Sequence, residues 1–187
     1  MMANKTKREV AGSYDALGGR LYDIRYRQEQ EAKYEVITSD LNPGPLDLVL
    51  DDGCGTGMLL KRLDSCYVGV DLSMGLLSTA RDLTRELANS HIILADADAL
   101  PFRHHVFDAV FAVTLIQNTP DPERTLDEIV YASREGARVA ITALRKTFTV
   151  ESFSELLASS GLRLEKMMAD KCLQDLIALT IADGEPG

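Results

Sequence analysis

Length, composition and charge describe an ordinary globular protein and exclude several classes. The chain has 187 residues, 45% hydrophobic and 26% charged, so we expect one compact α/β domain and not a disordered chain. The net charge of −9 argues against direct nucleic-acid binding by this chain alone. No apolar run reaches the roughly 18 residues that a membrane span needs, and no signal-peptide pattern opens the chain. A cytoplasmic protein without a membrane segment is the expectation.

The cysteines give no sign of a disulfide framework or a metal site. Cys54, Cys66 and Cys172 are odd in number, and no pair has metal-ligand spacing. The sequence therefore predicts reduced thiols and no metal.

The first forty residues have a helical pattern. Residues 7–40 predict one or two helices, interrupted near Gly18 and Gly19 and ended by the turn at 42–45. We expect residues 1–45 to form an N-terminal helical cap and residues 46–187 to form the main part of one compact domain.

From residue 46 onward, short apolar runs alternate with helical patterns. This alternation is typical of a parallel sheet covered by helices on both faces. Predicted strands are 46–51, 67–71, 91–96, 107–116, 137–144, 162–168 and 175–182, the last one expected to be antiparallel in a hairpin at the sheet edge. Predicted helices are 56–64, 74–88, 122–133 and 150–160, with Ser73, Asp121 and Thr149 as N-caps of the last three and Gly161 as the final stop.

A glycine-rich turn follows the first predicted strand in the stretch VLDDGCGTG, residues 49–57. The nicotinamide fingerprint requires a glycine where Met58 stands, and no Gly-Lys-Ser/Thr follows to make a P-loop. Asp51 and Asp52 precede the turn and make it acidic, which suits a cationic ligand better than a pyrophosphate. The turn therefore favours a nucleotide that is positively charged and has no phosphate.

Three carboxylates end three successive predicted strands. Asp51, Asp71 and Asp96 each follow an apolar run. A helix cap or a surface acid explains any one of them, but ligands bind open parallel sheets at the carboxyl ends of the strands. Together with the glycine turn, the three acids predict a ligand site at that edge.

Four stretches in order, VLDDGCGTG, VGVDLS, ADADALPF and FDAVFAVTLIQNTPDP…TLDEI, resemble the class I S-adenosylmethionine-dependent methyltransferases of the small single-domain kind. The resemblance covers nearly all of residues 46–181. It implies a Rossmann-like α/β fold, with a seven-stranded, mostly parallel sheet in the order 3-2-1-4-5-7-6 and helices on both faces. It also implies S-adenosyl-L-methionine as the cofactor.

The resemblance assigns the methionine end of this cofactor to the glycine turn. Asp51 would reach the methionine ammonium, and Gly53, Cys54 and Gly55 would form the floor. Asp52 departs from the family pattern, which places an apolar residue there, and its role is open.

The resemblance assigns the nucleoside end to the next two strand ends. Asp71 would accept from both ribose hydroxyls, and Leu72 would flank the adenine. Asp96 would accept from the adenine amine, with Asp98 as the alternative, and the Ala97 N–H would donate to the ring. Thr114 and Leu115 would lie where the fourth predicted strand runs past the methionine end of the cofactor.

The acceptor side is less defined. Methyl transfer from a sulfonium can proceed by positioning alone, and His91, His104 and His105 lie at the wrong end of the sheet, so no catalytic residue is assigned. Candidate acceptor contacts are Tyr14, Tyr22, Gln117 and Asn118, for each of which a purely structural role is the alternative.

The third strand is expected at a sheet edge, and its stretch HIILA lacks charge and proline. Its own loops, a second copy of the chain in a homodimer, or an activator subunit that adds a strand could cover it. Three functions stay open. The first is a methyltransferase for a small molecule, the second a tRNA or translation-factor methyltransferase with a small zinc-binding activator, and the third a non-catalytic cofactor-binding protein.

Overall fold

One seven-stranded sheet runs through the computed structural model, which describes residues 6–85, 87, 89–170 and 173–183. The strand order is β3-β2-β1-β4-β5-β7-β6, as the family resemblance implied. Strands β1 to β5 run parallel, and β7 pairs antiparallel with both β5 and β6. The strands are β1 (Leu48–Asp52), β2 (Cys66–Asp71), β3 (Ser90–Leu94), β4 (Phe107–Ala112), β5 (Ser133–Leu144), β6 (Leu162–Met168) and β7 (Asp175–Ala182).

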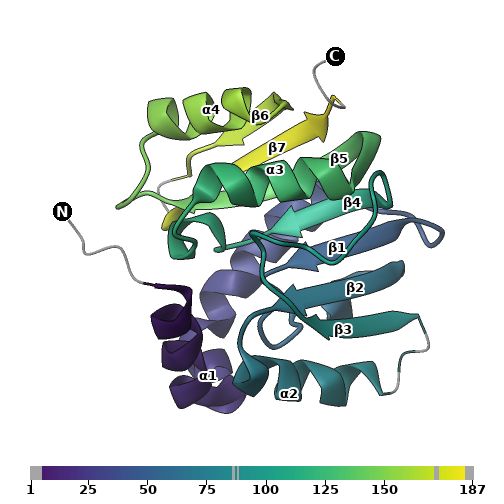
Figure 1. The fold of residues 1–187 in the computed structure, drawn as a ribbon, viewed down its shortest axis with the longest axis vertical. Helices are drawn as coiled ribbons and strands as arrows, with labels where there is room; N and C mark the ends of the chain where they lie inside the picture. The colour runs from purple at the N-terminus through teal and green to yellow at the C-terminus, as the bar shows by residue number, and fades with distance from the viewer. Residues whose placement is uncertain (1–5, 86, 88, 171–172, 184–187) are drawn as a thin grey trace.

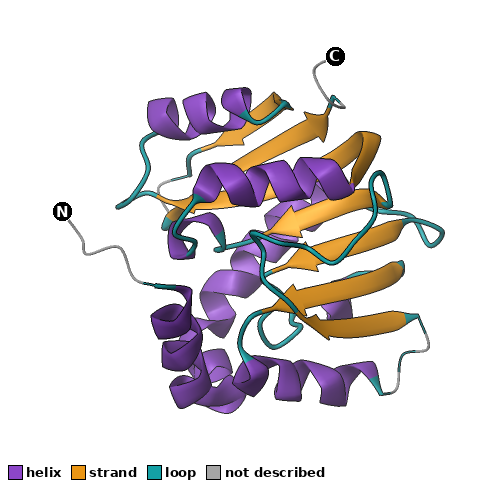
Figure 2. Ribbon diagram, viewed as in Figure 1, coloured by secondary structure: helices purple, strands orange, loops and turns teal. Residues whose placement is uncertain are grey.

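Helices cover both faces of the sheet, as predicted (Figures 1 and 2). They are α1 (Lys7–Leu41), α2 (Met74–Thr84), α3 (Pro122–Ala132) and α4 (Val150–Ser159), with short 3-10 turns η1 (Leu59–Arg62) and η2 (Ile116–Asn118). In Figure 1, α3 and α4 lie in front of the sheet, and the second half of α1 lies behind it. Ser73, Asp121 and Thr149 cap α2, α3 and α4 through their side chains, which confirms the predicted helix starts.

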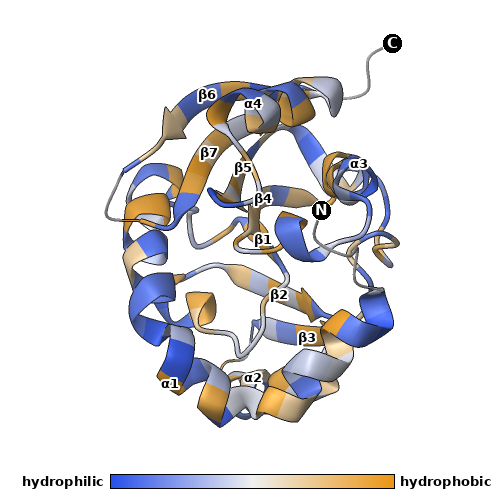
Figure 3. Ribbon diagram, turned by 90° about the vertical axis from the view of Figure 1, so that its left-hand side faces the viewer, coloured by the Kyte–Doolittle hydropathy of each residue, from blue (hydrophilic) through white to orange (hydrophobic). Residues whose placement is uncertain are grey.

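The alternation of side chains along the strands makes two apolar layers. On β1, Leu50 packs in the layer that includes Leu126 of α3, whereas Val49 packs in the layer that includes Ile37 of α1. Figure 3 looks onto the carboxyl ends of the parallel strands, and in it β7 is largely hydrophobic whereas α1 is largely hydrophilic. Successive residues of β1 therefore face different helices.

Several predicted boundaries are wrong by a few residues. β4 ends at Ala112 and not at residue 116, because the chain turns at Thr114 into η2. β5 begins at Ser133, four residues earlier than expected, and its register with β4 shifts between Phe107 and Ala109. The helix predicted at 56–64 is only the 3-10 turn η1. Cys172 and residues 86 and 88 of the predicted second helix lie outside the described residues.

Helix α1 breaks at Gly18, close to where the sequence predicted an interruption. Gly18 has φ 69° and ψ 155°, outside helical geometry, whereas the residues on both sides are helical. In Figure 1 the arrowheads of β1 to β4 point toward the side where the first half of α1 stands. The break therefore lets one half of α1 cover the sheet and the other half approach the strand ends. Within the described part of the chain, no helix has the length and apolar character needed to cross a membrane.

Candidate functional site

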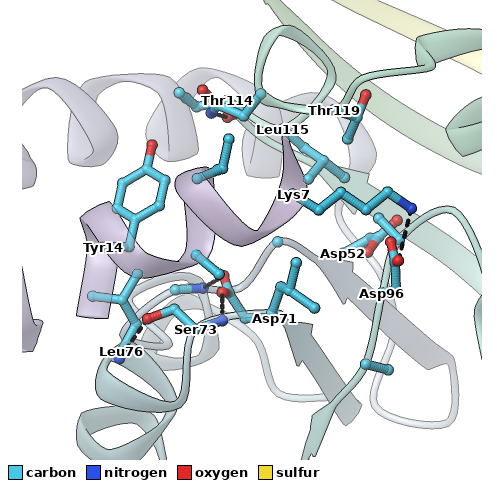
Figure 4. A pocket seen from close by; sticks show the side chains of 18 of the residues that line it. Lys7, Tyr14, Asp52, Asp71, Ser73, Leu76, Asp96, Thr114, Leu115 and Thr119 are labelled. Atoms are coloured by element: carbon cyan, nitrogen blue, oxygen red, sulfur yellow. Dashed lines mark hydrogen bonds and ion pairs between the residues drawn. The ribbon is translucent and has the colours of Figure 1, made fainter. Parts of the chain in front are cut away.

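A cavity lies at the carboxyl ends of the first four strands (Figure 4). Its walls come from the glycine turn after β1, the residues after β2 and β3, the start of α2, the loop after β4, and α1 on both sides of Gly18. This is the edge at which the three strand-end acids predicted a ligand site.

Most of the predicted site residues meet in this cavity. Its lining includes eight of the ten residues predicted to contact the cofactor, namely Gly53, Gly55, Asp71, Leu72, Asp96, Ala97, Thr114 and Leu115. Three of the four candidate acceptor contacts, Tyr14, Tyr22 and Asn118, also line it. Asp51, Cys54 and Gln117 do not belong to the lining. Lys7, Asp52 and Ser73 line it without having been predicted to do so.

Asp71 is held at the cavity by two backbone amides. Its Oδ2 accepts from the Gly55 N–H at 2.9 Å, and its Oδ1 accepts from the Ser73 N–H at 2.8 Å. Burial raises the pKa of Asp71, and these backbone hydrogen bonds offset part of the rise. Both oxygens are therefore fixed in place, while each keeps accepting capacity for a ligand.

The turn between β1 and η1 requires glycine at positions 53 and 55. Gly53 and Gly55 have φ values of 81° and 54°, in the left-handed region that disfavours residues with a Cβ. A Cβ on Gly53 would also lie 3.1 Å from Leu115 Cδ1. The N–H groups of Gly53 and Cys54 both donate to the Val70 carbonyl at 2.8 Å, which joins the turn to β2.

Asp51 and Asp52 point to opposite faces of the sheet, because successive side chains alternate along a strand. Asp51 is buried and accepts from Tyr67 Oη at 2.6 Å, on the face that α1 covers. Burial raises the pKa of Asp51 to about 7. The sequence predicted that Asp51 contacts the ligand, but Asp51 is not among the residues that line the cavity.

Asp52, the acid that departs from the family pattern, does line the cavity. Its side chain is fully buried, and neither carboxyl oxygen has a hydrogen-bond partner among the described residues. Burial raises the pKa of Asp52 well above its usual range, and the nearby Asp51 adds to the rise. From the alternation of side chains along a strand, the sequence could have predicted that Asp51 and Asp52 face opposite sides of the sheet. It could not have predicted which of the two sides holds the cavity.

Lys7 crosses the cavity to the acids that follow β3. Its Nζ lies 2.7 Å from Asp96 Oδ2 and 2.7 Å from Asp98 Oδ2. Asp96 lines the cavity, whereas the buried Asp98 does not and accepts from Thr125 Oγ1. No sequence pattern pointed to Lys7, because its partner Asp96 lies 89 positions away.

Thr114 stands in an unusual backbone conformation at the end of β4. Its φ is 62°, which is strained for a β-branched residue. Its N–H donates to Thr142 Oγ1 at 2.8 Å, and its own Oγ1 accepts from Lys33 Nζ at 2.8 Å and from Gln30 Nε2 at 3.2 Å. These bonds hold the turn that brings Thr114 and Leu115 to the cavity.

Aromatic side chains of α1 line the cavity near this turn. The ring centroids of Tyr14 and Tyr22 lie 5.9 Å apart, and those of Tyr22 and Tyr26 lie 5.0 Å apart. Burial raises the pKa of Tyr14 and of Tyr22, so both phenols stay protonated near neutral pH. Asn118 Nδ2 donates to the Thr114 carbonyl at 2.8 Å.

The charges in the lining favour a cationic ligand. The carboxylates of Asp71 and Asp96 outnumber the single ammonium of Lys7. Asp52 adds a third carboxyl group, for which burial favours the neutral form. Among the described residues, no group of three or more His, Cys, Asp or Glu side chains is arranged to hold a metal ion.

Comparison with known proteins places the chain in a family. The methyltransferase domain family matches residues 50–141. The malonyl-acyl-carrier-protein O-methyltransferase of Marinomonas sp. is 32% identical over 143 residues, which are 74% of this chain and 52% of that protein. The chain thus spans about half the length of that relative.

Solved structures share the fold at low sequence identity. The cyclase SpnF has a TM-score of 0.86 at 15% identity, covering 96% of this chain and 97% of the other. A chain from the complex of the Haloferax volcanii Trm112 methyltransferase activator has a TM-score of 0.83 at 17% identity, covering 95% of this chain and 99% of the other. The strand order, the strand-end site and the sequence match agree, and the chain belongs to the class I S-adenosylmethionine-dependent methyltransferases.

Proposed function

We propose that this chain binds S-adenosylmethionine in the strand-end cavity and transfers its methyl group to a small molecule that enters beside the first half of α1. One observation carries the proposal. An acidic cavity lies over a glycine turn, and two backbone amides present Asp71 to it. That arrangement suits the ribose of a cationic nucleoside.

The residues that line the cavity fit this cofactor. Asp71 would take the ribose hydroxyls, and Asp96 with the Ala97 N–H would take the adenine. Gly53 and Gly55 let the backbone approach the methionine part, where side chains would block it. Asp52 is a buried carboxyl that lacks a donor within the described chain, as expected of a group that meets a ligand.

The cofactor supplies a methyl group already activated by its sulfonium. The protein's part is then to bind, orient and exclude water. Holding a nucleophile in line with a methyl group can lower the activation barrier by several kcal/mol, on the order of other orientation effects. Tyr14 and Tyr22 cover the cavity from α1, and the described lining includes no histidine. We therefore assign the rate enhancement to positioning and name no general base.

Binding of the methyl donor is the first test. Calorimetry should detect S-adenosylmethionine binding to the wild-type chain, and Asp71→Ala should weaken it roughly tenfold to a hundredfold through the lost hydrogen bonds. Asp82→Ala is the matched control, because Asp82 is an exposed acid of α2 paired with Arg85. Absence of wild-type binding, or equal binding by Asp71→Ala, would contradict the proposal.

The acceptor class needs a second experiment. Transfer of a labelled methyl group is followed into a small-metabolite extract, bulk tRNA and protein. Incorporation into small molecules by the isolated chain supports the leading proposal. Binding without any transfer supports a non-catalytic cofactor-binding protein.

A second candidate is a tRNA or translation-factor methyltransferase that works with a small activator subunit. Strand β3 ends the sheet, and its Leu94 is 45% exposed, so a partner could add a strand there. The fold likeness to a chain from a Trm112 activator complex supports this candidate. Co-purification of a small subunit would favour it, whereas full transfer activity by a monodisperse monomer would rule it out.

A further inference from the structure

The carboxyl groups that line the cavity differ in whether the folded chain gives them a donor. Asp71 receives the two backbone N–H groups described above. Asp96 receives the Asp98 N–H at 3.0 Å on Oδ1 and Lys7 Nζ at 2.7 Å on Oδ2. Asp52 has no partner for either oxygen among the described residues. Of the three, it alone would depend on a ligand for its hydrogen bonds.

Folding does not explain an acid at this position. Asp52 has 0% of its surface exposed, and a buried carboxyl without a donor disfavours the folded state. The glycine turn does not use the Asp52 side chain, because the Gly53 and Cys54 N–H groups join it to the Val70 carbonyl. An apolar residue would fill the same place at lower cost, so the acid requires another reason.

The position of Asp52 within the cavity indicates which part of a ligand it meets. Figure 4 shows Asp52 beside Asp96, at the end of the cavity that the Lys7 side chain crosses, and away from Tyr14. Under the proposed function, Asp96 and Ala97 mark the nucleobase end. Asp52 therefore lies nearer the nucleobase than the acceptor side.

We propose that Asp52 is a second acid of nucleobase recognition, which accepts a hydrogen bond from the exocyclic amine of the adenine alongside Asp96. This inference rests on the proposed function. A primary amine carries two hydrogens, so two carboxyl acceptors can share it. A purine with a keto oxygen in place of the amine would present an acceptor to both acids and bind less well.

The test compares nucleobases without changing the charge of the ligand. Calorimetry measures S-adenosylhomocysteine and S-inosylhomocysteine, both neutral thioethers, against the wild type, Asp52→Leu and Asp52→Asn. The wild type should prefer the adenosyl compound. Asp52→Leu should weaken adenosyl binding on the order of tenfold and leave inosyl binding nearly unchanged, so that the preference falls. Asp52→Asn should keep part of the preference, because its amide oxygen still accepts.

Two further measurements separate this role from others. Asp51→Asn is the control, because it alters a buried acid one residue away that bonds Tyr67 outside the cavity, and the preference should not change. Ligand-free Asp52→Leu should unfold at the same temperature as the wild type or higher, since it removes a buried acid that lacks a donor.

The outcomes distinguish this inference from the proposed function. If the wild type binds neither thioether nor S-adenosylmethionine, the proposed function fails. If the wild type binds and Asp52→Leu retains the full adenosyl preference, Asp52 does not read the base. A selective loss of S-adenosylmethionine binding with an unchanged preference would assign Asp52 to the sulfonium charge and overturn the inference.

Discussion

Lys33 Nζ on α1 lies 2.5 Å from Asp175 Oδ2 on β7, and both side chains are fully buried. The same ammonium donates to Thr114 Oγ1, and the same carboxylate accepts from Thr142 Oγ1 at 3.1 Å. One ion pair thus joins the helix behind the sheet to the turn that carries Thr114 into the cavity.

Breaking this pair from one side should be costly. Lys33→Met leaves the buried Asp175 carboxylate without its ammonium, and Asp175→Leu leaves the buried Lys33 ammonium with only the partly exposed Glu29, 3.0 Å away. For each variant we expect a loss of about 3–5 kcal/mol in the free energy of unfolding. The double variant should lose much less than the sum of the two, because neither buried charge then remains and Glu29, the other partner of Lys33, is partly exposed. Urea unfolding of the four chains measures the coupling. The exposed pair Asp82–Arg85 is the control and should couple by less than about 1 kcal/mol. Additive losses at Lys33 and Asp175 would contradict the prediction.

The sequence predicted features that depend on nearby residues. Each helix cap at Ser73, Asp121 and Thr149 acts within three positions, so it can be read from a short stretch. Strand order followed from the resemblance to a family, and the break near Gly18 followed from a glycine pair.

Features that depend on distant partners could not be predicted. Lys33 has the sequence context of a surface helix charge, and its burial follows from Asp175, which is far along the chain. The apolar run after Phe107 continues past Ala112, but the strand ends there because Thr114 is held in a left-handed turn by Thr142. The ion pair by which Lys7 crosses the cavity to Asp96 likewise joins residues far apart in the sequence.

Asp51 should make stability depend on pH. Its pKa is raised from 3.8 to about 7 in the folded chain by burial. Below pH 3.8 the group is protonated in both states, and between about 3.8 and 7 only the folded state keeps the proton. Raising the pH through this window therefore destabilises the wild type, by up to about 4 kcal/mol from this group.

Asp51→Asn removes this dependence and retains an oxygen to accept from Tyr67. The stability of this variant relative to the wild type should rise from about pH 4 to about pH 7, the window set by the two pKa values of Asp51, and stay constant above it. Chemical unfolding at several pH values measures the difference. A difference that does not change with pH would show that Asp51 ionises normally in the folded chain.

The first half of α1 should open independently of the sheet. This half, which precedes the break at Gly18, is held to the rest of the domain by two sets of contacts. Lys7 pairs with Asp96, and Asp15 Oδ1 accepts from Ser73 Oγ at 2.6 Å and from the Gly75 N–H at 2.9 Å. The Ser73 and Gly75 hydrogen bonds lower the pKa of Asp15, which keeps it ionised near neutral pH.

Removing both contacts should loosen this half alone. Amide hydrogen exchange in residues 7–17 of a Lys7→Ala, Asp15→Ala variant should be faster than in the wild type, with exchange in the sheet unchanged. Lys166→Ala, which breaks an exposed pair with Asp40, is the control and should leave residues 7–17 unaffected. Equal exchange in both variants would show that other contacts hold the segment.

Two glycines of α1 should respond in opposite ways to alanine. Gly12 is helical and exposed, and a Cβ added there would have no atom within 4 Å, so Gly12→Ala should stabilise the chain by about 0.5–1 kcal/mol through helix propensity. A Cβ on Gly19 would overlap Thr79 Oγ1 and lie 2.8 Å from Thr79 Cβ, where α1 meets α2. Rotation of Thr79 relieves the first contact but not the second, so the helices must separate, at a cost of about 1–3 kcal/mol.

Thermal unfolding of these two variants measures the difference in sign. Because the separation also moves α1 away from the cavity, Gly19→Ala should weaken S-adenosylmethionine binding as well, whereas Gly12→Ala should preserve it. A stabilising Gly19→Ala would contradict the close approach of the two helices at Thr79.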